Sequence, residues 1–162
     1  MKKLDVMVLA SATFATNLFF APAAHAQTLP AQEMQGYVSF VSGGVGEDDA
    51  AAMKRAAAGF PLELQFVQKA TPRDEFLADV KVKIRDGSKN VVLDAVSKGP
   101  FLLAKLPDGK YHVEADYNGI VKRQIVDIRA NKHARAVFVW VGADESSMLR
   151  SSQIDNSNAQ YR

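Results

Sequence analysis

Two histidines, His112 and His133, are the first candidates for chemistry, because the third, His25, falls in an apolar N-terminal segment. His112 alternates with Glu114 and Asp116, so a strand would place these three on one face. Two histidines and a carboxylate can hold zinc, but zinc usually takes three or four ligands, and the chain has no cysteine. A solvated strand face is the favoured interpretation. We predict no metal site, no cofactor site and no catalytic residue.

A hydrolase would need one of these histidines beside a hydroxyl nucleophile. The chain contains serines but no G-x-S-x-G motif. A hydrolase is therefore the least favoured of three function classes, and it would require a histidine nitrogen within about 3 Å of a hydroxyl oxygen.

Basic side chains form an alternating row, Lys81, Lys83 and Arg85, and a pair, Lys122 and Arg123. Such a row on an outward strand face favours solubility and discourages edge pairing. An anionic partner such as a lipid head group is the alternative. The whole chain carries 20 basic and 18 acidic residues, and this near balance argues against a nucleic-acid partner.

The segment Ser42-Gly43-Gly44-Val45-Gly46 has the glycine content of a phosphate-binding loop before a helix. It lacks the Lys-Ser/Thr of a P-loop, and the acids Glu47-Asp48-Asp49 would repel a phosphate. The segment instead predicts a tight turn into a self-capped helix. That helix should cover residues 47–58, with Gly59-Phe60-Pro61 marking its end.

After Pro61, apolar and polar residues alternate with a period of two, which predicts half-buried strands. The dipeptides Asp86-Gly87, Asp108-Gly109 and Asn118-Gly119 predict turns, and Asn-Gly is the strongest hairpin signal. The expected strands cover residues 37–41, 62–66, 80–84, 91–96, 101–106, 111–117, 120–128 and 134–141. The last strand is apolar on both faces and is expected to be central or covered.

These elements predict a mainly β fold. Seven strands from Leu62 onward, about ten residues apart, indicate an antiparallel seven-stranded β-sandwich with one short N-terminal helix. Hydrophobic residues make up 48% of the chain, which is enough for a packed core.

Residues 1–26 have the pattern of a signal peptide. A basic start precedes an apolar run from about Val6 to Phe20, and Ala24 and Ala26 frame an A-x-A site that predicts cleavage before Gln27. The run is about 15 residues long, too short to span a bilayer core comfortably. We expect a periplasmic or secreted protein without a transmembrane segment once the signal is removed.

The remainder divides into three expected parts. Residues 27–35 form a flexible polar lead-in, residues 36–141 form the β-sandwich domain, and residues 142–162 form a disordered polar tail.

A longer motif lies in the domain. Gly99 to Ala115 follows the pattern G-x-F-x-x-x-x-L-P-x-G-x-Y-x-V, and Leu77 to Gly87 gives an alternating strand that ends in a turn. Both segments resemble the carboxypeptidase regulatory-like domain, a transthyretin-like or Ig-like β-sandwich. The resemblance covers Leu77 to Trp140. The family's T-D-x-x-G-x-F approach is replaced here by Asp94 to Phe101.

Four residues carry the core of this motif: Leu106, Pro107, Gly109 and Tyr111. Pro107 and Gly109 suit a sharp turn, after which Tyr111 can anchor the next strand in the core. The resemblance implies a non-catalytic module, and the chain also looks like exported bacterial proteins of unassigned role that carry this domain.

We therefore expect a non-catalytic exported module that binds another cell-envelope component, an unknown envelope protein or glycan. The alternative is a small-molecule or glycan-binding protein that uses a cleft beside the helix. The first function predicts an exposed sheet edge or flat patch, and the second predicts an exposed aromatic pair.

Overall fold

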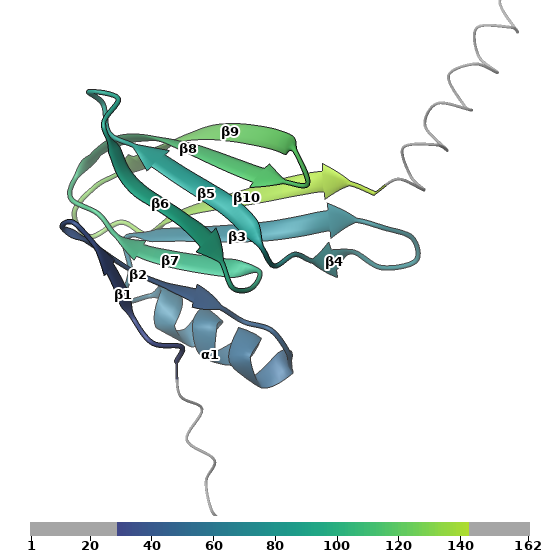
Figure 1. The fold of residues 1–162 in the computed structure, drawn as a ribbon. Coiled ribbons are helices and arrows are strands. Elements are labelled where there is room, and N and C mark those ends of the chain that lie inside the picture. Colours follow the sequence, from purple (N-terminus) through teal and green to yellow (C-terminus); the bar gives the residue numbers. More distant parts are fainter. Residues whose placement is uncertain (1–28, 143–162) are drawn as a thin grey trace, which may run out of the picture.

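The computed structural model describes residues 29–142 as a mainly β fold with two sheets and one helix, α1 (Glu47–Ala57) (Figure 1). The six-stranded sheet contains β1 (Glu33–Gln35), β2 (Val38–Gly43), β3 (Leu62–Lys69), β4 (Glu75–Phe76), β7 (Phe101–Lys105) and β10 (Ala134–Val141). The four-stranded sheet contains β5 (Val80–Arg85), β6 (Val91–Ser97), β8 (Gly109–Tyr117) and β9 (Ile120–Ile128).

Three predicted features lie outside the described residues. These are the signal segment 1–26, the cleavage residues Ala24, Ala26 and Gln27, and almost all of the expected tail at 142–162.

Local sequence explains where these elements start and turn. The helix α1 begins after Gly46, whose φ of +88° suits glycine, and it carries three acids in its first turn. No side chain caps this helix, so the expected self-capping is absent. Asn118 (φ +51°) and Gly119 (φ +82°) form the predicted hairpin between β8 and β9, with both central residues at positive φ.

The expected seven antiparallel strands differ from the structure in two ways. The six-stranded sheet has the order β1-β2-β7-β3-β10, and its sixth strand, β4, pairs with β3 outside this order. The β3–β10 pair is parallel, with Ala134 opposite Leu62 and Val141 opposite Lys69. The sequence analysis also did not include the short strands β1 and β4. Strand β1 comes from the end of the segment expected as a lead-in, and it pairs with β2.

The expected position of the last strand was wrong. Strand β10 ends the six-stranded sheet, and its outer face exposes Val137 and Val141. The central strand is β3, where Glu63 and Gln65, expected to face solvent, are each only 7% exposed. The alternating pattern gave the wrong exposure for Glu63 and Gln65 because side chains from β10 cover the polar face of β3.

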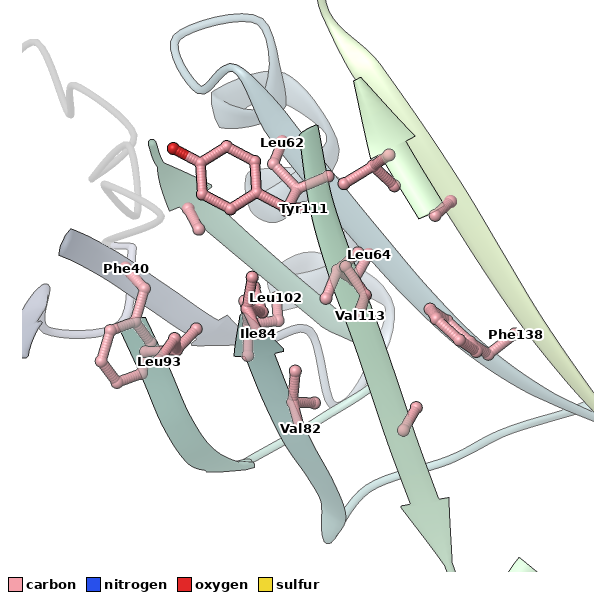
Figure 2. Packing of buried hydrophobic residues seen from close by; sticks show 14 of the residues in the cluster. Phe40, Leu62, Leu64, Val82, Ile84, Leu93, Leu102, Tyr111, Val113 and Phe138 are labelled. Carbon is pink, nitrogen blue, oxygen red and sulfur yellow. The ribbon is translucent and has the colours of Figure 1, made fainter. Parts of the chain in front are cut away.

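The main core lies between the two sheets (Figure 2). Large buried side chains from both sheets meet there, including Leu64 and Phe138 of the six-stranded sheet and Ile84 and Val113 of the four-stranded sheet. A smaller cluster, in which Met53 of α1 packs on Val41, Phe101 and Leu103, attaches the helix to the opposite side of the six-stranded sheet. The fold is thus a β-sandwich with a helix on one outer face.

Side-chain hydrogen bonds join the two sheets along both sides. On one side the amide of Asp94 in β6 donates to the Gln35 side chain at 2.7 Å. On the other side the Gln124 amide group donates to the Val137 carbonyl at 2.7 Å, and the Trp140 indole donates to the Ile120 carbonyl at 2.8 Å. These bonds occupy backbone groups at sheet edges that would otherwise invite strand addition.

Candidate functional site

The outer face of the four-stranded sheet carries charged side chains from all four of its strands. Strand register places its residues in three rows across β6, β5, β8 and β9. The rows are Val96-Lys81-Asp116-Val121, Asp94-Lys83-Glu114-Arg123 and Val91-Arg85-His112-Ile125. Cross-strand neighbours in one row lie close enough to interact, so opposite charges within a row offset each other.

Two of the rows balance their own charge. In the middle row, the Lys83 ammonium lies 3.1 Å from an Asp94 carboxylate oxygen, and the Arg123 Nε lies 2.9 Å from an oxygen of Glu114. In the first row, Lys81 stands opposite Asp116. These two rows correspond to the solvated strand face that the sequence predicted.

The third row has no acid. Arg85 is half-buried on β5 opposite His112 on β8, and among residues 29–142 Arg85 forms no ion pair. A β-bulge between Ile84 and Arg85 shifts the register at this point, so Arg85 stands opposite Val91 rather than Val92. Bulges re-aim side chains and are frequent beside binding sites.

A surface hollow of about 610 Å³ opens over this row, and we call it the cationic hollow. Its charged and apolar lining comprises Arg85, Lys89, His112, Glu114, Arg123 and Ile125. Glu114 is already paired with Arg123, and the other two lining cations, Arg85 and Lys89, form no ion pair within residues 29–142. The hollow therefore has the electrostatic character of an anion site.

The turn that carries Lys89 is rigidly built. The Asp86 carboxylate accepts bonds from the amides of Ser88 and Asn90, each at 2.9 Å, and from the Asn90 side chain at 3.1 Å. The Asn90 side-chain bond is the main cause that lowers the pKa of Asp86 below its usual value. Lys89 itself sits at φ +70°, so this turn holds its backbone in a conformation that the free chain rarely adopts.

A second polar group lies on the outer face of β3. Glu63 accepts from the His133 Nε2 at 3.0 Å and lies 3.3 Å from the Arg135 Nε, while Arg135 also bonds to Gln65. The His133 Nδ1 lies 2.9 Å from the Phe60 carbonyl oxygen. Sequence analysis missed this group because the parallel β3–β10 pairing joins residues about 70 positions apart. No short-range pattern signals such a contact.

The geometry bears on the hydrolase and metal hypotheses. Both ring nitrogens of His133 contact acceptor atoms, and neither His133 nor His112 contacts a hydroxyl group of residues 29–142. His112 lies in β8 of the four-stranded sheet and His133 lies directly before β10 of the six-stranded sheet, and the described residues contain no group of three side chains that could hold a metal ion. In the same part of the chain, no helix has the length and apolar character needed to cross a bilayer.

A third feature is a groove beside α1, which we call the helix groove. It has a volume of about 590 Å³ and lies between the start of α1 and β4, with Gly44, Ala50 and Pro100 among its lining. Phe76 is 58% exposed at its edge and stacks on Phe101 at a centroid distance of 6.3 Å, but Phe101 is only 1% exposed. The expected exposed aromatic pair is thus a single exposed ring.

The four motif residues lie together at the start of β8. Leu106 and Tyr111 are buried, and the Tyr111 hydroxyl donates to the Pro107 carbonyl at 3.0 Å. Gly109 lies against the same ring, and a Cβ added to this glycine would lie 3.5 Å from a ring carbon of Tyr111. This arrangement resembles a tyrosine corner in its geometry and stabilises the strand that carries His112.

Comparisons of this chain with family models, curated proteins and solved structures found no match.

Proposed function

We propose that the chain is an exported, non-catalytic β-sandwich module of transthyretin-like type, which binds another cell-envelope component through the outer face of the four-stranded sheet. The A-x-A pattern before Gln27 supports export to the periplasm or medium. The motif from Leu106 to Tyr111 supports the transthyretin-like assignment, and its buried tyrosine fits that role.

One observation carries the proposal: two rows of this face neutralise themselves, and the third does not. Arg85 and Lys89 come from different elements and converge on the same hollow. The face also exposes the aliphatic side chains of Val91 and Ile125 beside the hollow, and exposed apolar groups of this kind often mark a binding surface.

Affinity isolation of the tagged protein after in-cell crosslinking tests the proposal. Wild type is compared with Arg85→Glu, which reverses charge at the hollow, and with Lys105→Glu, a matched control on the helix side of the six-stranded sheet. We expect wild type and Lys105→Glu to recover the same envelope component and Arg85→Glu to lose it. Equal recovery by all three proteins would contradict the choice of this face.

A second candidate function is small-molecule or glycan binding in the helix groove. The exposed Phe76 ring above an apolar floor favours it, because such rings stack on sugar faces and apolar ligands. Substituting Phe76→Ala should then abolish ligand recovery while Arg85→Glu leaves it intact. This pattern is the reverse of the one expected for the sheet face.

A further inference from the structure

We propose that the cationic hollow binds the phosphate of an anionic lipid head group, so that the outer face of the four-stranded sheet rests against a membrane surface. This inference rests on the proposed function and names the chemical class of its partner.

The charge arrangement favours a phosphate. The Arg85 guanidinium offers a planar set of N–H donors that can grip two phosphate oxygens at once, and Lys89 adds a second positive charge from the turn. The bonds to Asp86 hold this turn in place, so little ordering is needed when the ligand binds. The His112 ring lines the same hollow and can contribute a further N–H.

The apolar residues of the face favour a lipid over a free anion. Ile125 is 67% exposed and Val91 is 46% exposed, and they flank Arg85 and His112 in the same row. Val96 (51%) and Val121 (38%) repeat this arrangement at the other end of the face. Aliphatic side chains on both edge strands, with cations between them, can contact acyl chains and head groups together. A free phosphate ion would make no contact with these exposed aliphatic groups.

The same face argues against a glycan. None of its three rows contains Trp, Tyr or Phe, whereas carbohydrate binding usually relies on stacking against such rings. The exposed aromatic rings Tyr37 and Phe76 lie outside the four-stranded sheet, before β2 and in β4. The hollow therefore fits a phospholipid better than a sugar polymer.

Vesicle co-sedimentation of the exported full-length protein tests this inference. Vesicles of phosphatidylglycerol mixed equally with phosphatidylcholine are compared with vesicles of phosphatidylcholine alone. We expect binding only to the anionic vesicles, weakened by salt. The double variant Arg85→Ala/Lys89→Ala should reduce partitioning into the vesicles by roughly tenfold to thirtyfold. Two basic residues are lost, and each contributes a similar share of the binding free energy at an anionic surface.

One further substitution measures the apolar contribution to vesicle binding separately from the charge contribution. Ile125→Ser should reduce vesicle partitioning roughly tenfold, because a partly inserted aliphatic side chain is lost. The matched controls are Lys105→Ala, on the helix side of the six-stranded sheet, for the charge and Val141→Ser for the apolar residue, and both should remain within about threefold of wild type. Circular dichroism checks that each variant is folded.

Each other outcome overturns the inference. An equal loss in Lys105→Ala would show general attraction of the protein to the anionic surface without a site. If inorganic phosphate or glycerol phosphate displaces the protein from the vesicles and binds it as tightly as the vesicles do, the ligand is a free anion. If no vesicle binds while crosslinking still recovers a protein or glycan through Arg85, the inference fails and the proposed function stands. If Arg85→Glu also leaves that recovery unchanged, both fail.

Discussion

Replacing Tyr111 with alanine should lower the free energy of unfolding by about 3–5 kcal/mol, the usual loss for a large buried aromatic side chain. Tyr111 is 4% exposed and belongs to the cluster of core residues between the two sheets (Figure 2). The substitution removes the ring and leaves a cavity at the start of β8. It should act on the strand that positions His112 as well as on overall stability.

Tyr111→Phe separates the ring from its hydroxyl. This variant keeps the packing and loses only the bond to the Pro107 carbonyl, so we expect a loss of about 0.5–1.5 kcal/mol. Pro107 is exposed, so water can solvate the freed carbonyl and the loss should fall in the lower half of that range.

Urea titration followed by tryptophan fluorescence measures both losses, because Trp140 is buried in the same core. With a slope of about 2 kcal/mol per molar urea, Tyr111→Ala should shift the midpoint by roughly 1.5–2.5 M. His112→Ala, at the next and exposed position of β8, is the matched control and should stay within about 0.5 kcal/mol of wild type. A loss below about 1 kcal/mol for Tyr111→Ala would refute the core assignment.

The ionisation of Tyr111 gives an independent check. Burial, followed by the nearby Tyr37, Asp86 and Asp108, raises the pKa of Tyr111 above its usual value. The folded protein therefore keeps the phenol proton at a pH where the unfolded chain loses it. Stability from this source is complete below about pH 10 and is lost as the pH rises through the folded pKa. Tyr111→Phe should show a weaker alkaline loss than wild type, and equal alkaline loss would contradict the burial argument.

Three other substitutions test different parts of the fold. Gly99→Ala should lower the free energy of unfolding by about 1–3 kcal/mol in a denaturant titration, because the added Cβ would lie 2.5 Å from the Gly43 carbonyl carbon. An unchanged stability would show that the two backbone segments can move apart. Glu63→Ala should cost about 1–2 kcal/mol, since its partners such as His133 are partly exposed, and a loss above about 3 kcal/mol would mean a fully buried ion pair. Asp86→Ala should be less stable than wild type at neutral pH. That difference should disappear in thermal melts as the pH falls through the lowered pKa of Asp86, below about pH 4, because the carboxylate stabilises the turn only when ionised.

Local sequence patterns predicted most of the elements. Eight of the ten strands, the helix and the Asn118-Gly119 hairpin lie where alternation and turn residues placed them, within a few residues. Such features depend on neighbours in the chain, so a period of two or a glycine at positive φ can be recognised without a structure. Short strands such as β4, with only two residues, have no detectable period.

Long-range pairing limited the prediction elsewhere. The parallel contact between β3 and β10 buries Glu63 beneath Arg135, and alternation alone would place Glu63 in solvent. The cationic hollow could not be predicted from the sequence for the same reason. The sequence showed the row that ends at Arg85, but only the register across four strands shows which cations are neutralised by an opposite acid.

The central claim is that the outer face of the four-stranded sheet is the binding surface. A photoreactive benzoylphenylalanine at position 125 of this face, compared with one at position 45 beside the helix groove, tests it most directly in cells. Ile125 and Val45 are similarly exposed, at 67% and 62%, so exposure alone does not favour either site. The account predicts a discrete crosslinked product from position 125 and none from position 45. Crosslinks from position 45 alone, or from neither position, would contradict it.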